Sequence, residues 1–284
     1  MAIELATQFL PYVDEKFTTE SKTSLITNNN FNWSGAHSVK VYKVSTSVMH
    51  DYDRVGSGIT LSRYGAAKGL EATTEEFPLA KDRSFTFVID KLDQDETKRN
   101  LEAASALARQ LREVVIPEVD TYVLDKIVAG AGTTSAPAAL TKSNIYDMIA
   151  AATETLDTAE APEIGRVLLV PPATYTLMKK SPDIVMETNV GNELRLKGVL
   201  GFLDGATVVK VPATRLPDKV GFILAHAVAT VAPVKLDDYK IHADPPGISG
   251  YLIEGRIVYD AFVLDNKKKA IYAVSYTHLT LPTS

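Results

Sequence analysis

A long polar segment between two strand-like runs constrains the fold of this chain more than any other feature. Apolar side chains alternate with other residues around positions 39–41 and again over 85–89, the pattern of half-buried strands. About thirty residues rich in Gly, Arg, Asp and Glu lie between the two runs, whereas a β-hairpin connection usually has about 2 to 5 residues. A polar excursion of this length has no core of its own, so we expect it to bind another surface.

The most polar part of this excursion, residues 51–80, is the candidate contact with a partner. Exposed ion pairs contribute only about 0.2–1 kcal/mol each, so we expect such a contact to combine several weak pairs. Six charged side chains are the candidates for these contacts: Arg54, Arg63, Lys68, Glu71, Glu75 and Glu76.

The first 35 residues are irregular, with a weak amphipathic opening that stops at Pro11 and a run of three asparagines at 28–30. Such a segment has few means of packing on itself. It predicts an arm that becomes ordered against another surface. Phe31 and Trp33 are candidate anchors of this arm in a partner groove. Alternatively, the two aromatic rings tuck under the subunit's own core.

A long helix is predicted after the second strand-like run. Acidic residues at 93–96 favour a helix start, Pro117 predicts a kink, and the apolar face continues to Gly130. The apolar stripe before the kink consists of Leu101, Ala104, Ala108, Leu111 and Val115.

The remainder predicts a compact α/β region followed by more β-structure. Residues 131–139 have the composition of a flexible linker, and Asn144 is placed to cap the next helix. Apolar runs at 167–170, 207–211 and 221–225 predict buried strands. An alternating strand over 251–260 is then expected to turn at Asp265-Asn266, with a returning strand at 269–272.

Composition excludes several classes of function. The chain has no cysteine, so it can form neither disulfides nor thiolate zinc sites. Its formal net charge of −5 argues against a protein whose main task is to grip nucleic acid. No stretch approaches the roughly 18 apolar residues of a membrane span, and the N-terminus lacks the pattern of a signal peptide. We therefore expect no membrane partner.

Candidate catalytic or ligand-binding groups are few, and each has a simpler interpretation. Gly56-Ser57-Gly58 lacks the third glycine and the following helix of a phosphate loop, so it predicts a turn. The acidic pairs at 51/53 and 237/238 are typical of solvated faces, and Lys267-Lys268-Lys269 is typical of a charged strand edge. No metal-ligand spacing links His37, His50, His226 and His242. We expect no catalytic residue, no cofactor and no metal.

The last eleven residues, Val274 to Ser284, are uncharged and follow a basic strand abruptly. They match the translation of a transposon-end adapter used in sequencing-library preparation. We therefore exclude them from the fold prediction and expect them to make no specific contact. The genuine C-terminus is expected to differ.

Four stretches in this order resemble the Hong Kong 97-type major capsid proteins of tailed bacteriophages, over essentially residues 1–273. They are Gly35-Ala36-x-x-Val39-Lys40-Val41, Val115-Ile116-Pro117-Glu118-Val119-Asp120-Thr121-Tyr122, Val167-Leu168-Leu169-Val170-Pro171-Pro172, and Asp260-Ala261-Phe262-Val263-Leu264-Asp265-Asn266-Lys267-Lys268-Lys269-Ala270-Ile271-Tyr272. The resemblance implies an α+β fold. Its parts are an N-arm (1–37), an E-loop hairpin (38–92), a spine helix of the P-domain (93–135), an α/β A-domain (136–235), P-domain return strands (236–273) and the adapter-like tail (274–284).

The resemblance also implies a function. It predicts a phage or prophage shell protein, not an enzyme, that assembles with itself through hexamers and pentamers around double-stranded DNA. Residues 51–80 would then contact the neighbouring subunit. A portal protein and a separate scaffolding protein are expected partners, packaged DNA is touched only non-specifically, and assembly takes place in the host bacterial cytoplasm. Two alternatives remain: an encapsulin-like nanocompartment shell, and an α/β enzyme built on residues 140–235.

Overall fold

The structure is a computed structural model, which describes residues 21–28, 38–55, 62–65, 69–96, 103–184 and 199–275. The chain divides into two units. The smaller unit consists of residues 35–79, and the larger combines residues 1–34 with 80–284. Helices and sheets are mixed in an α+β architecture, as the sequence predicted.

The smaller unit is built on a two-stranded antiparallel hairpin of β1 (Ser38–Val44) and β2 (Ala72–Pro78). The sequence predicted that the run at 85–89 would be the second strand of this hairpin, and that prediction was wrong. That run lies in β3 (Lys81–Asp90), which pairs with a strand of the larger unit. The sequence of β2, ATTEEFP, lacks apolar alternation because its pairing depends on β1 opposite it and not on a core beneath it.

The long helix of the larger unit has three parts, which are α3 (Ala103–Gln110), the π-helical segment η1 (Leu111–Val115) and α4 (Ile116–Ala129). One row of its buried side chains recurs every four residues, at Ala103, Leu107, Leu111, Val115, Val119, Val123 and Ile127, and Ile116, Asp120 and Leu124 form a second buried row in α4. An α-helix has about 3.6 residues per turn, so a spacing of four drifts by roughly 40° at each step. A wider π turn offsets part of this drift and keeps the stripe facing the same neighbours.

The π segment also accommodates the predicted distortion at Pro117. Proline has no N–H for the bond to the carbonyl four residues back, and its ring clashes with that carbonyl. The carbonyl in question belongs to Glu113, which lies inside η1. The sequence placed the distortion correctly. Of the predicted stripe, Leu111 and Val115 are buried, Ala104 and Ala108 are only half-buried, and Leu101 lies outside the described residues.

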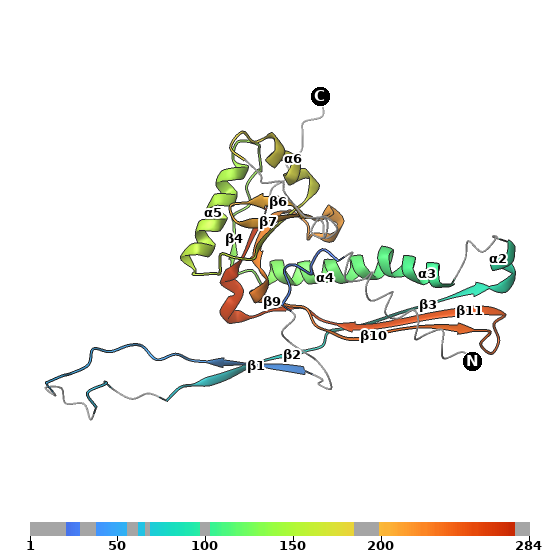
Figure 1. The fold of residues 1–284 in the computed structure, drawn as a ribbon, viewed down its shortest axis with the longest axis horizontal. Coiled ribbons are helices and arrows are strands. Elements are labelled where there is room, and N and C mark those ends of the chain that lie inside the picture. The colour runs from blue at the N-terminus through green and yellow to red at the C-terminus, as the bar shows by residue number, and fades with distance from the viewer. Residues whose placement is uncertain are drawn as a thin grey trace. The chain divides into compact units, whose positions relative to one another are not determined.

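A three-stranded antiparallel sheet lies along this helix (Figure 1), in the order β10 (Val234–Ala243), β11 (Gly250–Tyr259) and β3. The alternation predicted for 251–260 is confirmed. Ile253 and Ile257 are buried with the helix stripe, whereas Glu254 and Arg256 are exposed on the other face. Arg256 forms a two-bond ion pair with Asp82 of β3 there, at 2.9 and 2.6 Å.

A glycine in the middle of this sheet is closed over by two aromatic rings. Gly255 lies opposite Tyr239 of β10 and opposite Phe85 of β3. The two rings stack with centroids 6.1 Å apart. A Cβ at position 255 would come within 2.4 Å of the Phe85 ring and 2.8 Å of the Tyr239 ring. The rings therefore fill the space that a side chain would otherwise take.

The rest of the larger unit is a six-stranded mixed sheet, in the order β4-β13-β8-β5-β7-β6. The central strand, residues 166–170, is buried along its whole length because both faces are covered. Leu168 and Val170 pack with α5 and α6, whereas Val167 and Leu169 pack with α4. The elements are β4 (Thr133–Thr134), α5 (Ile145–Thr158), β5 (Arg166–Val170), α6 (Pro172–Lys180), β6 (Val199–Leu203), β7 (Ala206–Lys210), β8 (Val220–His226) and β13 (Ile271–Ser275).

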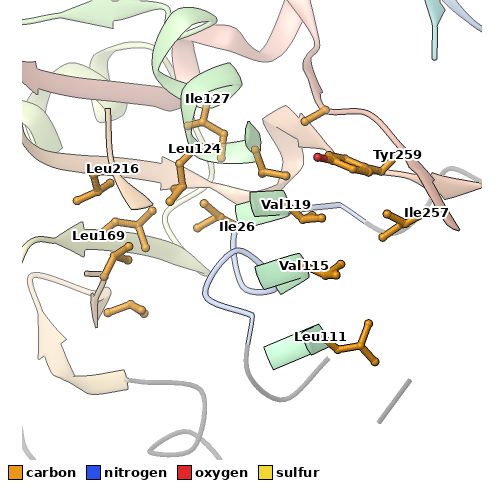
Figure 2. Close-up of a cluster of buried hydrophobic side chains, with 14 of the residues drawn as sticks. Ile26, Leu111, Val115, Val119, Leu124, Ile127, Leu169, Leu216, Ile257 and Tyr259 are labelled. Carbon is orange, nitrogen blue, oxygen red and sulfur yellow. The ribbon is translucent and has the colours of Figure 1, made fainter. Parts of the chain in front are cut away.

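The long helix joins the three-stranded and the six-stranded sheet of this unit through one continuous core. Figure 2 shows Leu111, Val115 and Val119 from the helix beside Ile257 and Tyr259 of β11. Leu124 and Ile127, further along the helix, lie with residues of the six-stranded sheet region. The larger unit is therefore held together along the helix and not through either sheet alone.

Four local expectations were wrong. Asp265-Asn266 opens the 3₁₀ helix η4 (Asp265–Ala270), and the strand after it pairs with β8 and not with β11. The stretch 131–139 contains β4, an edge strand parallel to β13. The Asn144 side chain makes no capping bond. Its amide group instead bonds Thr141 N–H and Ala139 C=O of the preceding segment.

The fourth error concerns the adapter-like tail. Val274 is 1% exposed and lies opposite Phe222 of β8, so it belongs to the core. Ser275 ends β13, and residues 276–284 lie outside the described part of the chain. Two residues at the start of the tail therefore complete the central sheet, contrary to the expectation of no specific contact.

Candidate assembly surfaces

The hairpin unit presents apolar side chains that its own residues do not cover. A two-stranded hairpin has no second layer of its own to pack against. The large apolar side chains exposed on this unit are Tyr42, Val44, Val48, Met49, Tyr52, Val55, Tyr64 and Leu70, of which Met49 is 98% exposed. Because burial of such side chains is the main driving force for association, this is the first candidate surface.

The described part of the hairpin loop is held in an extended, two-stranded path. Asp53 N–H donates to Arg63 C=O at 3.0 Å, and the rings of Tyr52 and Tyr64 meet edge to face with centroids 4.9 Å apart. Closer to the strands, Glu71 N–H donates to the Ser45 hydroxyl at 2.9 Å. The loop thus carries an aromatic pair on a hydrogen-bonded ladder. Tyrosine is enriched among residues that dominate binding energy.

The charged residues that the sequence nominated lie in different surroundings in the structure. Arg54, Arg63 and Glu71 are exposed on the hairpin unit. Glu75 forms an ion pair of 2.6 Å with Lys43 across the two strands, so it is engaged within its own hairpin. Lys68 and the arm anchors Phe31 and Trp33 lie outside the described residues. Glu76 lies in β2 opposite Lys40.

A buried carboxylate holds the residue at which the larger unit begins after the hairpin. Asp260 accepts a hydrogen bond from Ala80 N–H at 3.2 Å and another from the Tyr122 hydroxyl at 2.8 Å. Burial, followed by the hydrogen bond to Asp260, raises the pKa of Tyr122 well above its ordinary value. The phenol therefore keeps its proton and remains a donor. Asp260 therefore anchors Ala80, the first residue of the larger unit after residues 35–79.

The second candidate surface is a groove between β3 and the long helix. One end is an apolar hollow of about 130 Å³ lined by Phe85, Val114, Val115 and Ile257, among others. The groove continues past Gln110 to a wider hollow of about 430 Å³, bounded by Phe87 and Ala106. In the sheet order β3 is an edge strand, so the groove runs along an edge that no described strand covers.

The N-terminal segment is the third element placed by the structure. Residues 21–28 lie against the long helix, with Ile26 fully buried in the main core (Figure 2). Asp120 of α4, which is 1% exposed, accepts hydrogen bonds from this segment. The sequence did not nominate Asp120. The sequence pattern that could have identified Asp120 is an acidic residue on the apolar face of a helix, because Ile116, Val123 and Leu124 lie on the same face and are buried.

Groups suited to catalysis are not assembled in the part of the chain that the structure describes. Within those ranges no three His, Asp or Glu side chains come together to hold a metal ion. His226 bonds backbone groups of Ile164 and Val228, and His242 meets Glu254 at 3.2 Å. Lys267–Lys269 lie exposed in η4, and Gly56-Ser57-Gly58 lies outside the described residues. No described helix is long and apolar enough to cross a membrane.

A hairpin unit with uncovered apolar side chains, a long helix along a three-stranded sheet and a six-stranded sheet covered by helices are features expected of a shell subunit. The family model of phage capsid proteins matches residues 74–274, which is more than half of the 284 residues. The chain therefore belongs to the phage capsid protein family and has the Hong Kong 97-type fold of tailed-phage major capsid proteins.

Solved structures of similar fold include viral and virus-like shells. A Mycobacterium phage Che8 structure has a TM-score of 0.67 at 20% identity, covering 89% of this chain and 90% of that chain. The capsid of cyanophage P-SCSP1u has a TM-score of 0.66 at 15% identity, covering 89% and 87%. A virus-like particle from Pyrococcus furiosus has a TM-score of 0.57 at 10% identity, covering 96% and 100%. No curated protein matches the chain.

Proposed function

We propose that this major capsid protein assembles through hexamers and pentamers into an icosahedral shell that encloses double-stranded DNA, in the cytoplasm of a bacterial host. The observation that carries the proposal is the hairpin unit, which exposes large apolar side chains that it cannot cover itself. A free subunit with such a surface is poorly stable in water, whereas a shell offers every copy a covering neighbour.

The exposed apolar side chains of the described residues gather mainly at two places, and this suggests how copies meet. Eight of them lie on the hairpin unit, and Val88 and Val114 line the groove beside β3. A hairpin of one copy seated in the groove of the next buries both surfaces at once. Such a contact joins two different patches, so it closes into rings when the rotation between copies permits.

This arrangement changes the expected character of the contact. The charged candidates include Arg54 and Arg63, which are exposed, but exposed pairs stabilise by only about 0.2–1 kcal/mol each. Burying one large apolar side chain contributes about 1.5–3 kcal/mol. The hairpin is therefore held mainly by apolar side chains such as Met49, Tyr52 and Tyr64, with the arginines improving register and specificity.

The remaining partners follow from the same proposal. A portal protein and a separate scaffolding protein act during assembly. The net charge of −5 favours non-specific and weak contact with packaged DNA, since strong binding requires a basic surface. The protein performs no chemical reaction.

A hairpin-shortening experiment tests the proposal. Val44 lies opposite Ala72 in the register of β1 and β2, so replacing residues 45–71 by Asn-Gly leaves the strands paired. The shortened subunit should remain folded, as measured by circular dichroism and thermal melting, because the larger unit has its own core. It should form no particles in sedimentation and electron microscopy. Normal particles from the shortened subunit would refute the role of the hairpin.

A matched pair of variants separates the two kinds of contact. Tyr52→Ser combined with Tyr64→Ser removes the aromatic pair and leaves the charges. Arg54→Gln combined with Arg63→Gln removes the exposed cations and leaves the rings. We expect the first variant to lose most particles and the second to retain them at low salt. The opposite result would show that the hairpin binds through charge.

An encapsulin-like shell remains the second candidate, favoured by the likeness to the Pyrococcus furiosus virus-like particle over the full length of that chain. A shell of that kind would form complete particles from this chain alone and would enclose a protein cargo. Mass spectrometry and nucleic-acid staining of particles from the native source distinguish the two, because a phage shell contains DNA.

A further inference from the structure

A buried carboxylate on the long helix binds the N-terminal segment as if it were a separate peptide. Asp120 Oδ1 accepts hydrogen bonds from the hydroxyls of Ser21 at 2.7 Å and Thr23 at 2.9 Å. Its Oδ2 accepts from Lys22 N–H at 2.9 Å and from the Arg215 guanidinium at 2.9 Å. Four donors from two distant parts of the chain thus converge on one carboxylate, and we call this group the Asp120 cradle.

The cradle is built to hold a charge away from water. Asp120 is 1% exposed, and Ser21 and Thr23 are 9% and 5% exposed. A buried carboxylate is tolerated only when its oxygens are satisfied by donors or by an opposite charge. Arg215 supplies the charge, but three of the four donors come from residues 21–23. Departure of the segment would leave Asp120 with Arg215 alone.

The cradle lies at the place where the described N-terminal segment begins. Downstream, the segment is held by Ile26 in the core and by the bond of Asn28 N–H to Thr230 C=O at 2.7 Å. Upstream stand twenty further residues of the chain. With the cradle closed, the described segment is first attached to the subunit at Ser21. With the cradle open, its first firm attachment becomes Ile26, five residues later, a span of up to about 17 Å in extended chain.

We propose that Asp120 is a positioning residue for assembly: by binding residues 21–23 it fixes the point at which the chain before Ser21 is attached to the subunit, so that this part of the chain can bind a second copy. This inference rests on the proposed shell function. Residues 1–20 carry apolar side chains such as Ile3, Leu5 and Phe9, which suit burial against another subunit. A segment whose attachment point is fixed loses less conformational entropy when it binds a neighbouring subunit.

Two variants open the cradle by different routes. In Asp120→Asn the new amide presents N–H groups to Lys22 N–H or to Arg215, so at least one donor loses its acceptor. In the double variant Ser21→Ala/Thr23→Ala the ion pair of Asp120 with Arg215 and the bond from Lys22 N–H stay. The two hydroxyl donors to Asp120 are removed, together with the bonds that the Ser21 hydroxyl makes with Thr23. The matched control is Thr153→Ala/Thr155→Ala, which removes two hydroxyls that bond only carbonyls of their own helix.

Two readouts decide the matter. The first is the rate at which trypsin cleaves the Lys22–Thr23 bond, followed by mass spectrometry. Loss of one hydrogen bond to a charged group should raise this cleavage rate about tenfold or more, because the rate follows the fraction of molecules in which the segment is released. The second is particle yield, by sedimentation and electron microscopy. We expect both cradle variants to be cleaved faster and to lose most particles, with the melting of the larger unit retained, and the control to behave like the parent.

The outcomes that overturn the inference are distinct from failure of the shell function. If the parent protein forms no particles, the proposed function fails. If parent and control form particles, unchanged cleavage in the cradle variants shows that Asp120 does not hold the segment. Faster cleavage with normal particles shows that assembly does not depend on a fixed point of departure. Should Asp120→Asn fail to fold, the Ser21/Thr23 variant, which keeps the ion pair, decides alone.

Discussion

Substitution of Gly255 by alanine tests the packing between β11 and its two neighbours. The added Cβ would lie 2.4 Å from the ring of Phe85 and 2.8 Å from the ring of Tyr239, whereas non-bonded carbon atoms prefer about 3.5–4.0 Å. Overpacking of this kind costs about 1–3 kcal/mol. Alanine in place of glycine recovers about 0.5–1 kcal/mol by restricting the unfolded chain. We therefore expect a net loss of roughly 1–2 kcal/mol.

The assay is urea unfolding followed by circular dichroism, with a double-mutant cycle. Phe85→Leu removes ring atoms from the strand that borders the groove, so the methyl group at 255 gains room. The two substitutions should then be less costly together than the sum of the separate effects, with a coupling of about 0.5 kcal/mol or more. Gly69→Ala is the control, because nothing lies within 4 Å of a Cβ there, and it should change stability by less than about 0.5 kcal/mol.

Two results would refute this reasoning. If Gly255→Ala is as stable as the parent, the rings do not depend on the empty space at 255. If the costs of the two substitutions simply add, Phe85 is not the group that the new methyl displaces.

Three further predictions concern the cores and the tail. Leu107→Ala should cost about 2–5 kcal/mol in urea unfolding, since Leu107 is 2% exposed, whereas Val114→Ala, at 47% exposed, should cost less than about 0.5 kcal/mol. Burial raises the pKa of Tyr259 from 10.0 to about 12, so the unfolded chain loses this proton at a lower pH than the folded protein does. The free energy of unfolding should therefore decline as pH rises from 10 to 12, and it should decline less in Tyr259→Phe. Deleting residues 276–284 should leave thermal melting unchanged. Val274→Asp should instead destabilise the protein strongly, because it places a charge in the core of the six-stranded sheet. A neutral effect of Val274→Asp would contradict the placement of β13.

Local patterns in the sequence were sufficient where one element meets one environment. The run at 167–170 is apolar at every position because both faces of β5 are covered, and its burial is complete. The alternation in β11 was readable because only one face of that sheet meets the helix. In both cases the periodicity of the side chains records how many sides are buried.

The sequence describes the candidate surfaces less completely than the fold. It singled out residues 51–80 as a polar excursion without a core of its own, and all but the last of these residues belong to the separate unit of residues 35–79, because length and polarity are local properties. It emphasised the charged residues and passed over Tyr52 and Tyr64, whose pairing depends on the path of the loop. Exposure of an apolar side chain has no signature in the sequence until the neighbours that fail to cover it are known.

Only the tertiary structure decided which distant segments meet. The sequence by itself determined where the long helix and the strands with a clear apolar pattern form, since side-chain period is carried by a few consecutive residues; the short or polar strands β2 and β4 have no such pattern. The strand at 271–275 reads the same whether it returns to β11 or joins β8, and the choice is made by the core that β8 and β5 already provide. Likewise, Asp120 is an ordinary helix acid until a segment almost a hundred residues away supplies its donors. The energy of such pairing depends on contact in space. When two segments lie far apart in the chain, the sequence of neither segment shows which partner it will contact.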